Sequence, residues 1–238
     1  MTALQLTIAM VAVFVGACAQ GSLGFGLGVI GAPVLALVDP VLVPGPLLAV
    51  ALVLTAMVAW RERGALVWGD LGWALAGRVP GSILGTFAVV LLPEQGLSVL
   101  FALLVLAGVG LSIAGLTVRP SDPALFVAGA ASGVMGSITA IGAPPMALIY
   151  QREKGPKLRS TLAAFFLFGA TLSLLLLVIA GEFHRTDLRY ALLLLPPVLI
   201  GFGVSQWVKP WLDRGYTRPL ILGFSAAMSA LLLITVIV

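Results

Sequence analysis

The sequence predicts an all-α integral membrane protein, a polytopic helical bundle made of two four-element repeats. Three observations lead to this fold class. Hydrophobic residues make up 61% of the chain and charged residues only 9%, whereas a soluble domain carries roughly 25% charged residues. Almost the whole chain divides into apolar runs close to the length of a membrane-spanning helix. Two glycine-rich runs, one in each half of the chain, resemble each other.

Eight apolar runs follow one another, separated mostly by short charged loops. They cover residues 3–38, 42–59, 71–92, 96–117, 124–150, 160–180, 188–207 and 219–238. Because about 20 apolar residues cross a bilayer, six of the runs fit one crossing each. The first and fifth runs, with 36 and 27 residues, are too long for one straight crossing. No Lys or Arg precedes the first run, so we expect it to be part of the mature protein and not a signal peptide.

The two overlong runs carry related motifs. Three sets of residues match between the halves: Gly21 and Gly24 with Gly133 and Gly136 at a separation of 112, Ile30–Pro33 with Ile141–Pro144 at 111, and Pro80 and Gly85 with Pro196 and Gly201 at 116. These matches predict two copies of one unit, a first transmembrane repeat over residues 1–118 and a second over residues 119–238.

The loop charges distinguish two topologies. If all eight runs cross the bilayer, the Lys and Arg residues of the loops divide 7 to 6 between the two sides. If the first and fifth runs are re-entrant, the division becomes 11 to 2, with only Arg185 and Arg189 on the poorer side. The positive-inside rule favours the second topology, in which each repeat crosses three times, the copies are inverted and both termini lie outside. A kinked crossing of the fifth run remains the alternative.

The glycine-rich runs predict broken helices around a substrate site. Each interior glycine costs a helix about 1 kcal/mol relative to alanine, and we expect helix breaks at Pro33 and Pro144 because proline interrupts a helix. A helix that restarts after a break directs free N–H groups towards an anion, and we expect these donors at residues 26–29 and 137–140. The alternative use of such glycines is close helix packing. The predicted substrate-binding residues of the two runs are Gln20, Gly21, Ser22, Gly24, Phe25, Gly26, Gly28, Ser132, Gly133, Gly136, Ser137 and Thr139.

Arg78 lies a few residues into the third run. A cation at this depth either faces an anionic substrate or extends its side chain to the lipid headgroups. We favour the headgroup interpretation and keep Arg78 as a candidate substrate-binding residue.

The sequence offers no residues for catalysis or for a metal site. It has one cysteine, Cys18, and one histidine, His184, so neither a disulfide within the chain nor a histidine cluster is expected. No Asp or Glu lies in the middle of an apolar run, and no nucleotide-binding motif is present. We therefore expect a protein that is not an enzyme and needs no cofactor.

At its glycine motifs the chain resembles the sulfite exporter TauE/SafE family, also called the 4-toluene sulfonate uptake permease family. The likeness rests on Gly21–Gly28 followed by Pro33, and on Ser132–Gly136 followed by Gly142–Pro144, and it covers essentially the whole chain. The resemblance implies transport of sulfur-containing anions such as sulfite, sulfonates or sulfoacetate across a bacterial inner membrane. The second copy departs from the glycine-rich pattern at Ser137 and Thr139, so the identity of the substrate does not carry over.

We therefore expect a secondary transporter, a multi-pass protein of the bacterial inner membrane, that moves a small sulfur-containing or organic anion by alternating access. Its expected partners are the anionic substrate and the lipid bilayer, with no nucleic acid; a homo-oligomer is left open. Two alternatives remain, a passive anion channel and a non-transporting membrane assembly subunit whose glycines serve only packing. The exact substrate, the transport direction and the coupling ion do not follow from the sequence.

Overall fold

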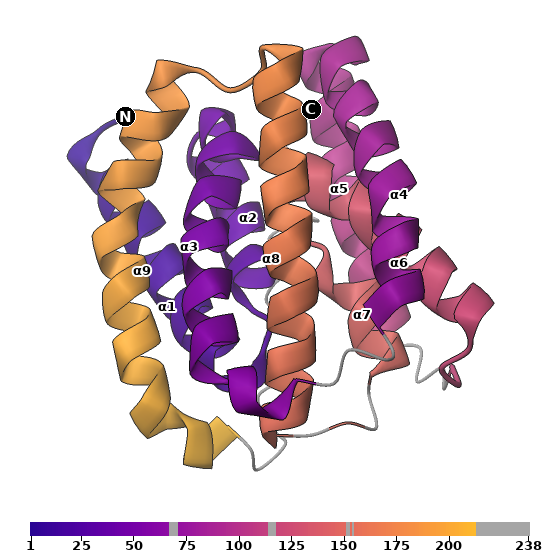
Figure 1. The fold of residues 1–238 in the computed structure, drawn as a ribbon. Helices are drawn as coiled ribbons and strands as arrows, with labels where there is room; N and C mark the ends of the chain where they lie inside the picture. Colours follow the sequence, from indigo (N-terminus) through magenta and orange to yellow (C-terminus); the bar gives the residue numbers. More distant parts are fainter. Residues whose placement is uncertain (67–70, 114–117, 151–152, 154, 213–238) are drawn as a thin grey trace.

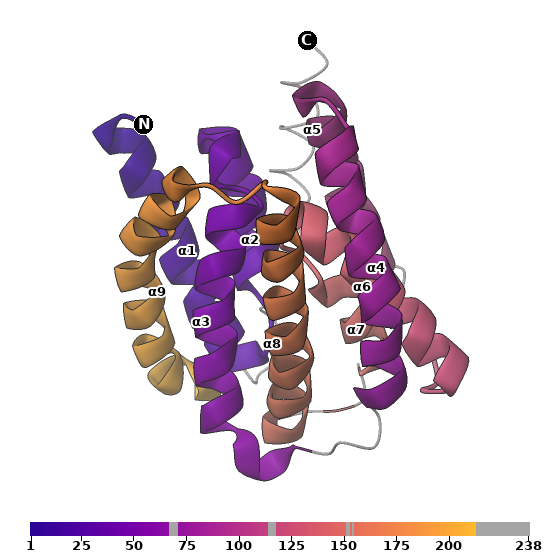
Figure 2. The ribbon, with the colours of Figure 1, turned by 45° about the horizontal axis from the view of Figure 1, so that its top comes forward.

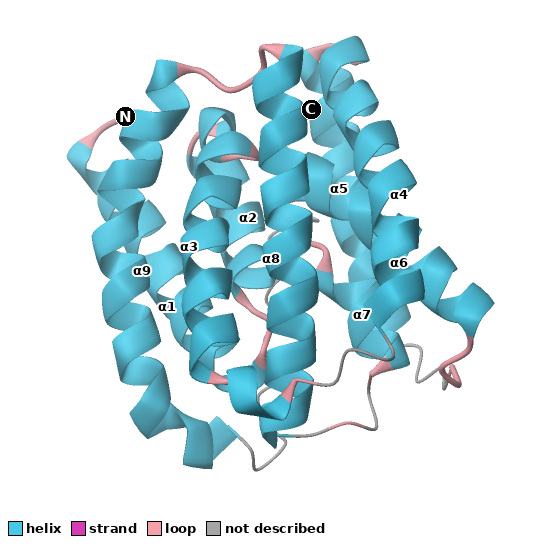
Figure 3. Ribbon diagram, viewed as in Figure 1, coloured by secondary structure: helices cyan, strands magenta, loops and turns pink. Residues whose placement is uncertain are grey.

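The computed structural model describes residues 1–66, 71–113, 118–150, 153 and 155–212, and within these residues every regular element is a helix (Figure 3). The helices lie side by side as one bundle (Figure 1). The predicted run over residues 219–238 lies outside the described residues. The described part of the chain therefore confirms the all-α prediction.

Helices of two lengths make up the bundle. The longer ones are α1 (Ala3–Leu23), α3 (Gly45–Arg61), α4 (Leu71–Leu91), α5 (Glu94–Ile113), α6 (Asp122–Thr139), α8 (Gly155–Ala180) and α9 (Arg185–Leu212). The shorter ones are α2 (Leu27–Val38), α7 (Ala143–Ile149) and the 3₁₀ turns η1 (Pro40–Leu42) and η2 (Arg63–Ala65). In two views of the bundle, α3 and α8 stand between α9 and α4 (Figure 1 and Figure 2).

Several of these helices have the length and composition of membrane spans. Five stretches of the described residues qualify: Ala3–Leu23, Pro40–Arg61, Leu71–Leu91, Gly155–Ala180 and Arg185–Lys209. Their outward surfaces carry large apolar side chains, for example Leu91 and Ile179, which are 74% and 72% exposed. An apolar surface of this kind is suited to lipid and not to water, in agreement with a multi-pass membrane protein.

The first overlong run is broken between α1 and α2. Gly24 and Gly26 have φ angles of 93° and 150°, which side chains disfavour and glycine tolerates. The chain reverses direction at this break. As a result, the end of α2 lies beside the start of α1, where the Gln5 side chain donates a hydrogen bond of 3.1 Å to the carbonyl of Val38. The prediction of a break at Pro33 is wrong: this proline lies inside α2, and the positive φ angles seven to nine residues earlier end the preceding helix instead.

The fifth run is broken between α6 and α7. Ala140 ends α6 in the left-handed region at φ 56°, and α7 begins at Ala143. Pro144 therefore lies in the first turn of α7, where a missing N–H costs little, and the break itself comes just before it.

The sequence separation between the two breaks differs from the separation between the two glycine motifs. Leu23 and Thr139 end the first helices and Leu27 and Ala143 begin the second ones, so both pairs are 116 residues apart. The glycine motifs match at 111 and 112, about one helical turn less. Small residues one turn apart occupy the same face of a helix. When the sequences of the two halves are aligned, a motif of such residues therefore also matches one turn away from its structural counterpart.

Glycines bring α4 and α6 together as a parallel pair. Successive glycines of α4 face successive carbonyl groups of α6: Gly77 faces Phe126, Gly81 faces Ala130 and Gly85 faces Val134. Any side chain at these positions would overlap the neighbouring backbone. The pair α1 and α9 is built in the same way, with Gly201 against the carbonyl of Phe14. Close packing is thus one confirmed use of glycine in this chain.

Candidate functional site

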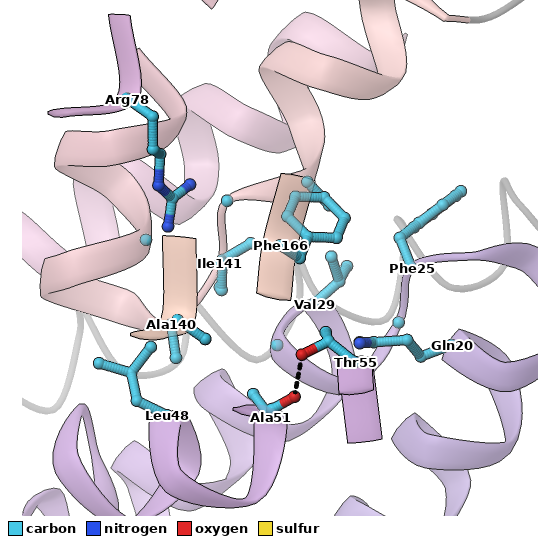
Figure 4. A pocket seen from close by; sticks show the side chains of 16 residues that line it. Gln20, Phe25, Val29, Leu48, Ala51, Thr55, Arg78, Ala140, Ile141 and Phe166 are labelled. Atoms are coloured by element: carbon cyan, nitrogen blue, oxygen red, sulfur yellow. Dashed lines mark hydrogen bonds between the residues drawn. The ribbon is translucent and has the colours of Figure 1, made fainter. Parts of the chain in front are cut away.

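The two helix breaks meet inside the molecule. Gly28, in the first turn of α2, lies so close to the second break that an added Cβ would overlap the carbonyl oxygen of Ala140. A cavity of about 40 Å³ lies at this junction, which is room for a few water molecules. It is lined by Phe25, Gly26, Gly28 and Val29 of the first break, Ala140, Ile141, Gly142 and Ala143 of the second, and Gln20, Leu48, Ala51, Thr55, Arg78, Gly136, Phe166 and Ala170 of the surrounding helices (Figure 4). We call this cavity the central pocket.

Arg78 supplies the charge of the central pocket. Its side chain is only 3% exposed, and its Nη1 donates hydrogen bonds of 2.8 Å to the Ser132 carbonyl and 2.6 Å to the Ser132 hydroxyl. Its Nε has no hydrogen-bond partner among the residues that the structure describes. None of the ion pairs formed by the described residues includes Arg78. The expectation that this side chain reaches the headgroups is therefore wrong.

Three glycines make room for the Arg78 guanidinium group. A Cβ would lie 2.5 Å from Nη2 at Gly136, 2.7 Å from Nη1 at Gly142 and 2.5 Å from Cζ at Gly169. The ring of Phe165 lies 5.3 Å from Cζ and adds a cation–π contact. The sequence thus provides space for a cation deep in the bundle, with neutral groups around it.

The first break contributes backbone donors. The Gln20 side chain accepts a hydrogen bond of 3.1 Å from the N–H of Leu27 and so fixes the start of α2. The first backbone hydrogen bond of α2 runs from Ile30 to the carbonyl of Gly26. The N–H groups of Gly28 and Val29 precede it in the first turn, where helical N–H groups lack intrahelical partners and the helix dipole is positive. Both residues line the central pocket.

The second break provides fewer such donors than expected. The N–H of Ala140 donates to the carbonyl of Gly136 and the N–H of Ile141 to the Thr139 hydroxyl, each at 3.0 Å. Residues 137–139 are the last turn of α6, so the expected donors at 137–140 are already used. In α7, Pro144 and Pro145 have no N–H group. Arg78 lines the pocket on this side.

The predicted site residues divide into two groups. Six of them line the central pocket: Gln20, Phe25, Gly26, Gly28, Arg78 and Gly136. The others lie around it: Ser22 donates to the carbonyls of Cys18 and Ser205, Ser132 holds Arg78 and donates to the carbonyl of Gly142, Ser137 bonds to Ser173, Thr139 donates to the carbonyl of Met135, and Gly21, Gly24 and Gly133 pack against Ser205, Arg159 and Ser82. A substrate-binding role for either group stays a prediction.

The two walls of the pocket do not follow from the sequence. Leu48, Ala51 and Thr55 of α3 form one wall, and Phe166 and Ala170 of α8 form the other. These residues belong to ordinary apolar runs, and no motif in either run distinguishes a pocket-facing position from a lipid-facing one.

A larger cavity, of about 690 Å³, lies at the end of the bundle where α3 and α9 begin. Its titratable side chains are Glu94, Glu182, His184 and Asp187. It reaches inwards to Ile138, two residues before Ala140 of the central pocket. We call it the outer cavity, because the positive-inside rule predicts this end of the bundle to lie outside the cell.

The chain matches the sulfite exporter TauE/SafE family over residues 8–232, which is nearly its whole length. No curated protein and no solved structure matches it. Proteins of this family are membrane transporters, and the family implies a lipid bilayer around the chain and a small anion as its substrate. The apolar helices and the buried cation of the central pocket agree with both. The chain therefore belongs to the sulfite exporter TauE/SafE family.

Proposed function

We propose that this protein is a secondary transporter that moves a small sulfur-containing or organic oxyanion across a bacterial inner membrane by alternating access. The observation that carries the proposal is Arg78, a buried cation with no carboxylate partner among the described residues, at the point where two broken helices meet. Removing a charge from water is costly unless a partner charge and hydrogen bonds offset the cost, and an anion in the central pocket would supply the partner charge.

Two kinds of donor would bind the anion. Arg78 offers the positive charge and an unpaired Nε, and the first turn of α2 offers the N–H groups of Gly28 and Val29. Both line the same pocket. Charge-assisted hydrogen bonds from a guanidinium and from a helix N-terminus are the usual means of holding an oxyanion.

The arrangement of the helices supports an inverted repeat. The parallel pair of α4 with α6 corresponds to the pair of α9 with α1. Gly85 lies in the first interface and Gly201 in the second, and the two glycines are 116 residues apart. The return of α2 to the start of α1 supports a re-entrant first segment. Inverted repeats with broken helices at the midplane let one half move against the other around a fixed site. The outer cavity would then be the route to the central pocket from one side.

Flux through purified protein in liposomes tests this function. Sulfite, thiosulfate, sulfoacetate, taurine and sulfate form the substrate panel, with unlabelled substrate loaded on the opposite side as a control. A carrier is expected to show saturable flux that the trans substrate stimulates. Flux that neither saturates nor responds to trans substrate would support a passive channel instead, and no flux of any panel member would refute the proposed substrate class.

Arg78→Gln is the matched variant for the site. We expect it to lower flux by about 100-fold, because about 2.7 kcal/mol is a modest estimate for one lost charge-assisted contact in a buried site. Arg78→Lys keeps the charge and is expected to recover part of the flux. Flux in Arg78→Gln equal to that of the wild type would show that the anion binds elsewhere.

A further inference from the structure

Three cationic side chains meet at the end of the bundle opposite the outer cavity. Arg61 at the end of α3, Arg159 near the start of α8 and Lys209 near the end of α9 all contact one oxygen, Oε1 of Glu62. The three nitrogen–oxygen distances are 3.2, 3.2 and 2.7 Å. Within the described residues, one carboxylate balances one of these positive charges, so the cluster keeps two in excess. We call it the basic cluster.

The two arginines are held in place without Glu62. Arg61 donates to the carbonyl of Gly21 through Nη2 and to the Ser205 hydroxyl at 3.1 Å through Nη1. Arg159 donates to the carbonyl of Ser22 at 3.4 Å. These carbonyls belong to the last turn of α1, where helical carbonyl groups lack intrahelical partners and carry partial negative charge. The arginines are therefore preorganised for an anion, whether or not that anion is Glu62.

Glu62 occupies the basic cluster as a bound anion would. Its side chain is 9% exposed. Burial raises the pKa of this carboxyl group, but hydrogen bonds from Lys209 and Arg159 lower it, and the net shift is downwards. The carboxyl group is thus ionised at neutral pH, and it makes its three contacts to cations with a single oxygen.

The basic cluster adjoins the central pocket. Gly24 of the first break lies against Arg159, since an added Cβ would be 3.2 Å from the Cα of Arg159. The next two residues, Phe25 and Gly26, line the central pocket. The cluster therefore lies beside the first break, on the side of the pocket away from the outer cavity.

We propose that the basic cluster is a second anion-binding site, specific for small oxyanions, and that Glu62 occupies it as a tethered carboxylate until a free oxyanion displaces it. An oxyanion such as sulfite presents three oxygens to the three cations, and it can accept paired hydrogen bonds from arginine. The site would bind the same class of anion as the central pocket. The choice of ligand therefore rests on the proposed function, whereas the geometry of the site does not.

Sulfite binding by the purified full-length chain in nanodiscs tests the second site, with sodium chloride at equal ionic strength as the reference. The Arg78→Gln background removes the charge of the central pocket. In that background, we expect Glu62→Gln to lower the Kd for sulfite by about tenfold, because it removes the competing carboxylate and keeps the shape of the side chain. An unchanged Kd would overturn the proposal.

Lys209→Gln is a second test of the cluster, and Arg63→Gln is its matched control. Both remove one positive charge at the same end of the bundle, but Arg63 is exposed and contacts Trp60 instead of Glu62. We expect Lys209→Gln to weaken sulfite binding by about tenfold and Arg63→Gln to change it less than twofold. Equal effects of the two variants would overturn the proposal, and this comparison holds even if Glu62→Gln does not fold.

The two proposals fail in different ways. If the wild type shows no saturable flux but Glu62→Gln still tightens binding in the Arg78→Gln background, transport is refuted and the second site stands. If flux depends on Arg78 but no variant of the basic cluster changes sulfite binding, the central pocket stands and the second site is refuted.

Discussion

The first and second helix breaks share a backbone plan but differ in chemistry. In each break a residue in the left-handed region, Gly24 or Ala140, donates its N–H to the carbonyl four residues earlier. Across the first break, the Gln20 side chain binds the N–H of Leu27. Across the second break, the Ser132 hydroxyl binds the carbonyl of Gly142 and also holds Arg78. The first break is thus bridged through an N–H donor at the start of the next helix, and the second break through a carbonyl acceptor just before the next helix.

This difference places opposite demands on the two helices that follow. The first turn of α2 keeps the N–H groups of Gly28 and Val29 available, whereas the first turn of α7 contains two prolines and has fewer N–H groups to offer. The charge that α7 does not supply comes from α4. The residue 116 positions after Arg78 is Leu194, which is buried and apolar. The two breaks therefore share a backbone plan, but the cation of the central pocket comes from one side only.

Among changes to the breaks themselves, the largest effect is expected where the two breaks touch. Gly28→Ala would place a Cβ on the carbonyl oxygen of Ala140, and relief of such a contact costs about 1–3 kcal/mol. Since this separates the two breaks, we expect flux to fall by about 30-fold. Gly31→Ala is the control on the same helix, because its nearest neighbour would be 3.7 Å away. Similar flux in the two variants would show that contact between the breaks is not required.

A smaller effect is expected from crowding the cation. Gly169→Ala would place a Cβ 2.5 Å from Cζ of Arg78, which must then tilt away from its position. We expect the KM for the transported anion to rise about tenfold, equivalent to about 1.4 kcal/mol of binding energy. Gly203→Ala, with open space around its Cβ, is the control in α9. A normal KM in Gly169→Ala would mean that the position of Arg78 is not critical.

The bridge of the first break is expected to matter less. Gln20→Ala leaves the N–H of Leu27 without its acceptor, and loss of a cap of this kind costs about 1 kcal/mol. The melting temperature in detergent should fall by a few degrees, and flux should fall by about threefold. Thr171→Ala removes an exposed hydroxyl that bonds within its own helix and should leave both values unchanged. A Gln20→Ala protein as stable as the wild type would contradict the bridging role.

A small effect of the opposite sign is expected from adding a donor to the second break. Pro145→Ala adds one N–H group to the first turn of α7. An interaction with a helix terminus contributes about 0.3–1 kcal/mol, so the Kd for sulfite should fall by less than about fivefold. The Kd is measured by titration of the purified protein. A gain above tenfold would show that the second break contacts the anion directly and that the two breaks are more alike than proposed.

The sequence predicted the positions of both unusual segments because of their length and glycine content. Runs of 36 and 27 apolar residues do not fit one crossing, and the structure divides each into two helices. The register between the copies was displaced by about one turn, because small residues at helical spacing match equally well one turn away. The break at Pro33 was wrong for a related reason: proline lowers the stability of a helix, but the positive φ angles at Gly24 and Gly26 are what end α1.

The amino-acid sequence by itself determined that this protein resides in a lipid bilayer and that it contains two broken segments. Both depend on local quantities, the apolar content of each run and the number of glycines within it. Only the tertiary structure decided that Arg78 is buried, that Leu48, Thr55 and Phe166 form walls around it, and that Arg61, Arg159 and Lys209 meet at Glu62. These contacts join residues far apart in the chain, and they depend on which face each helix turns inwards. In a helix that is apolar on every side, composition does not distinguish the face towards a pocket from the face towards lipid.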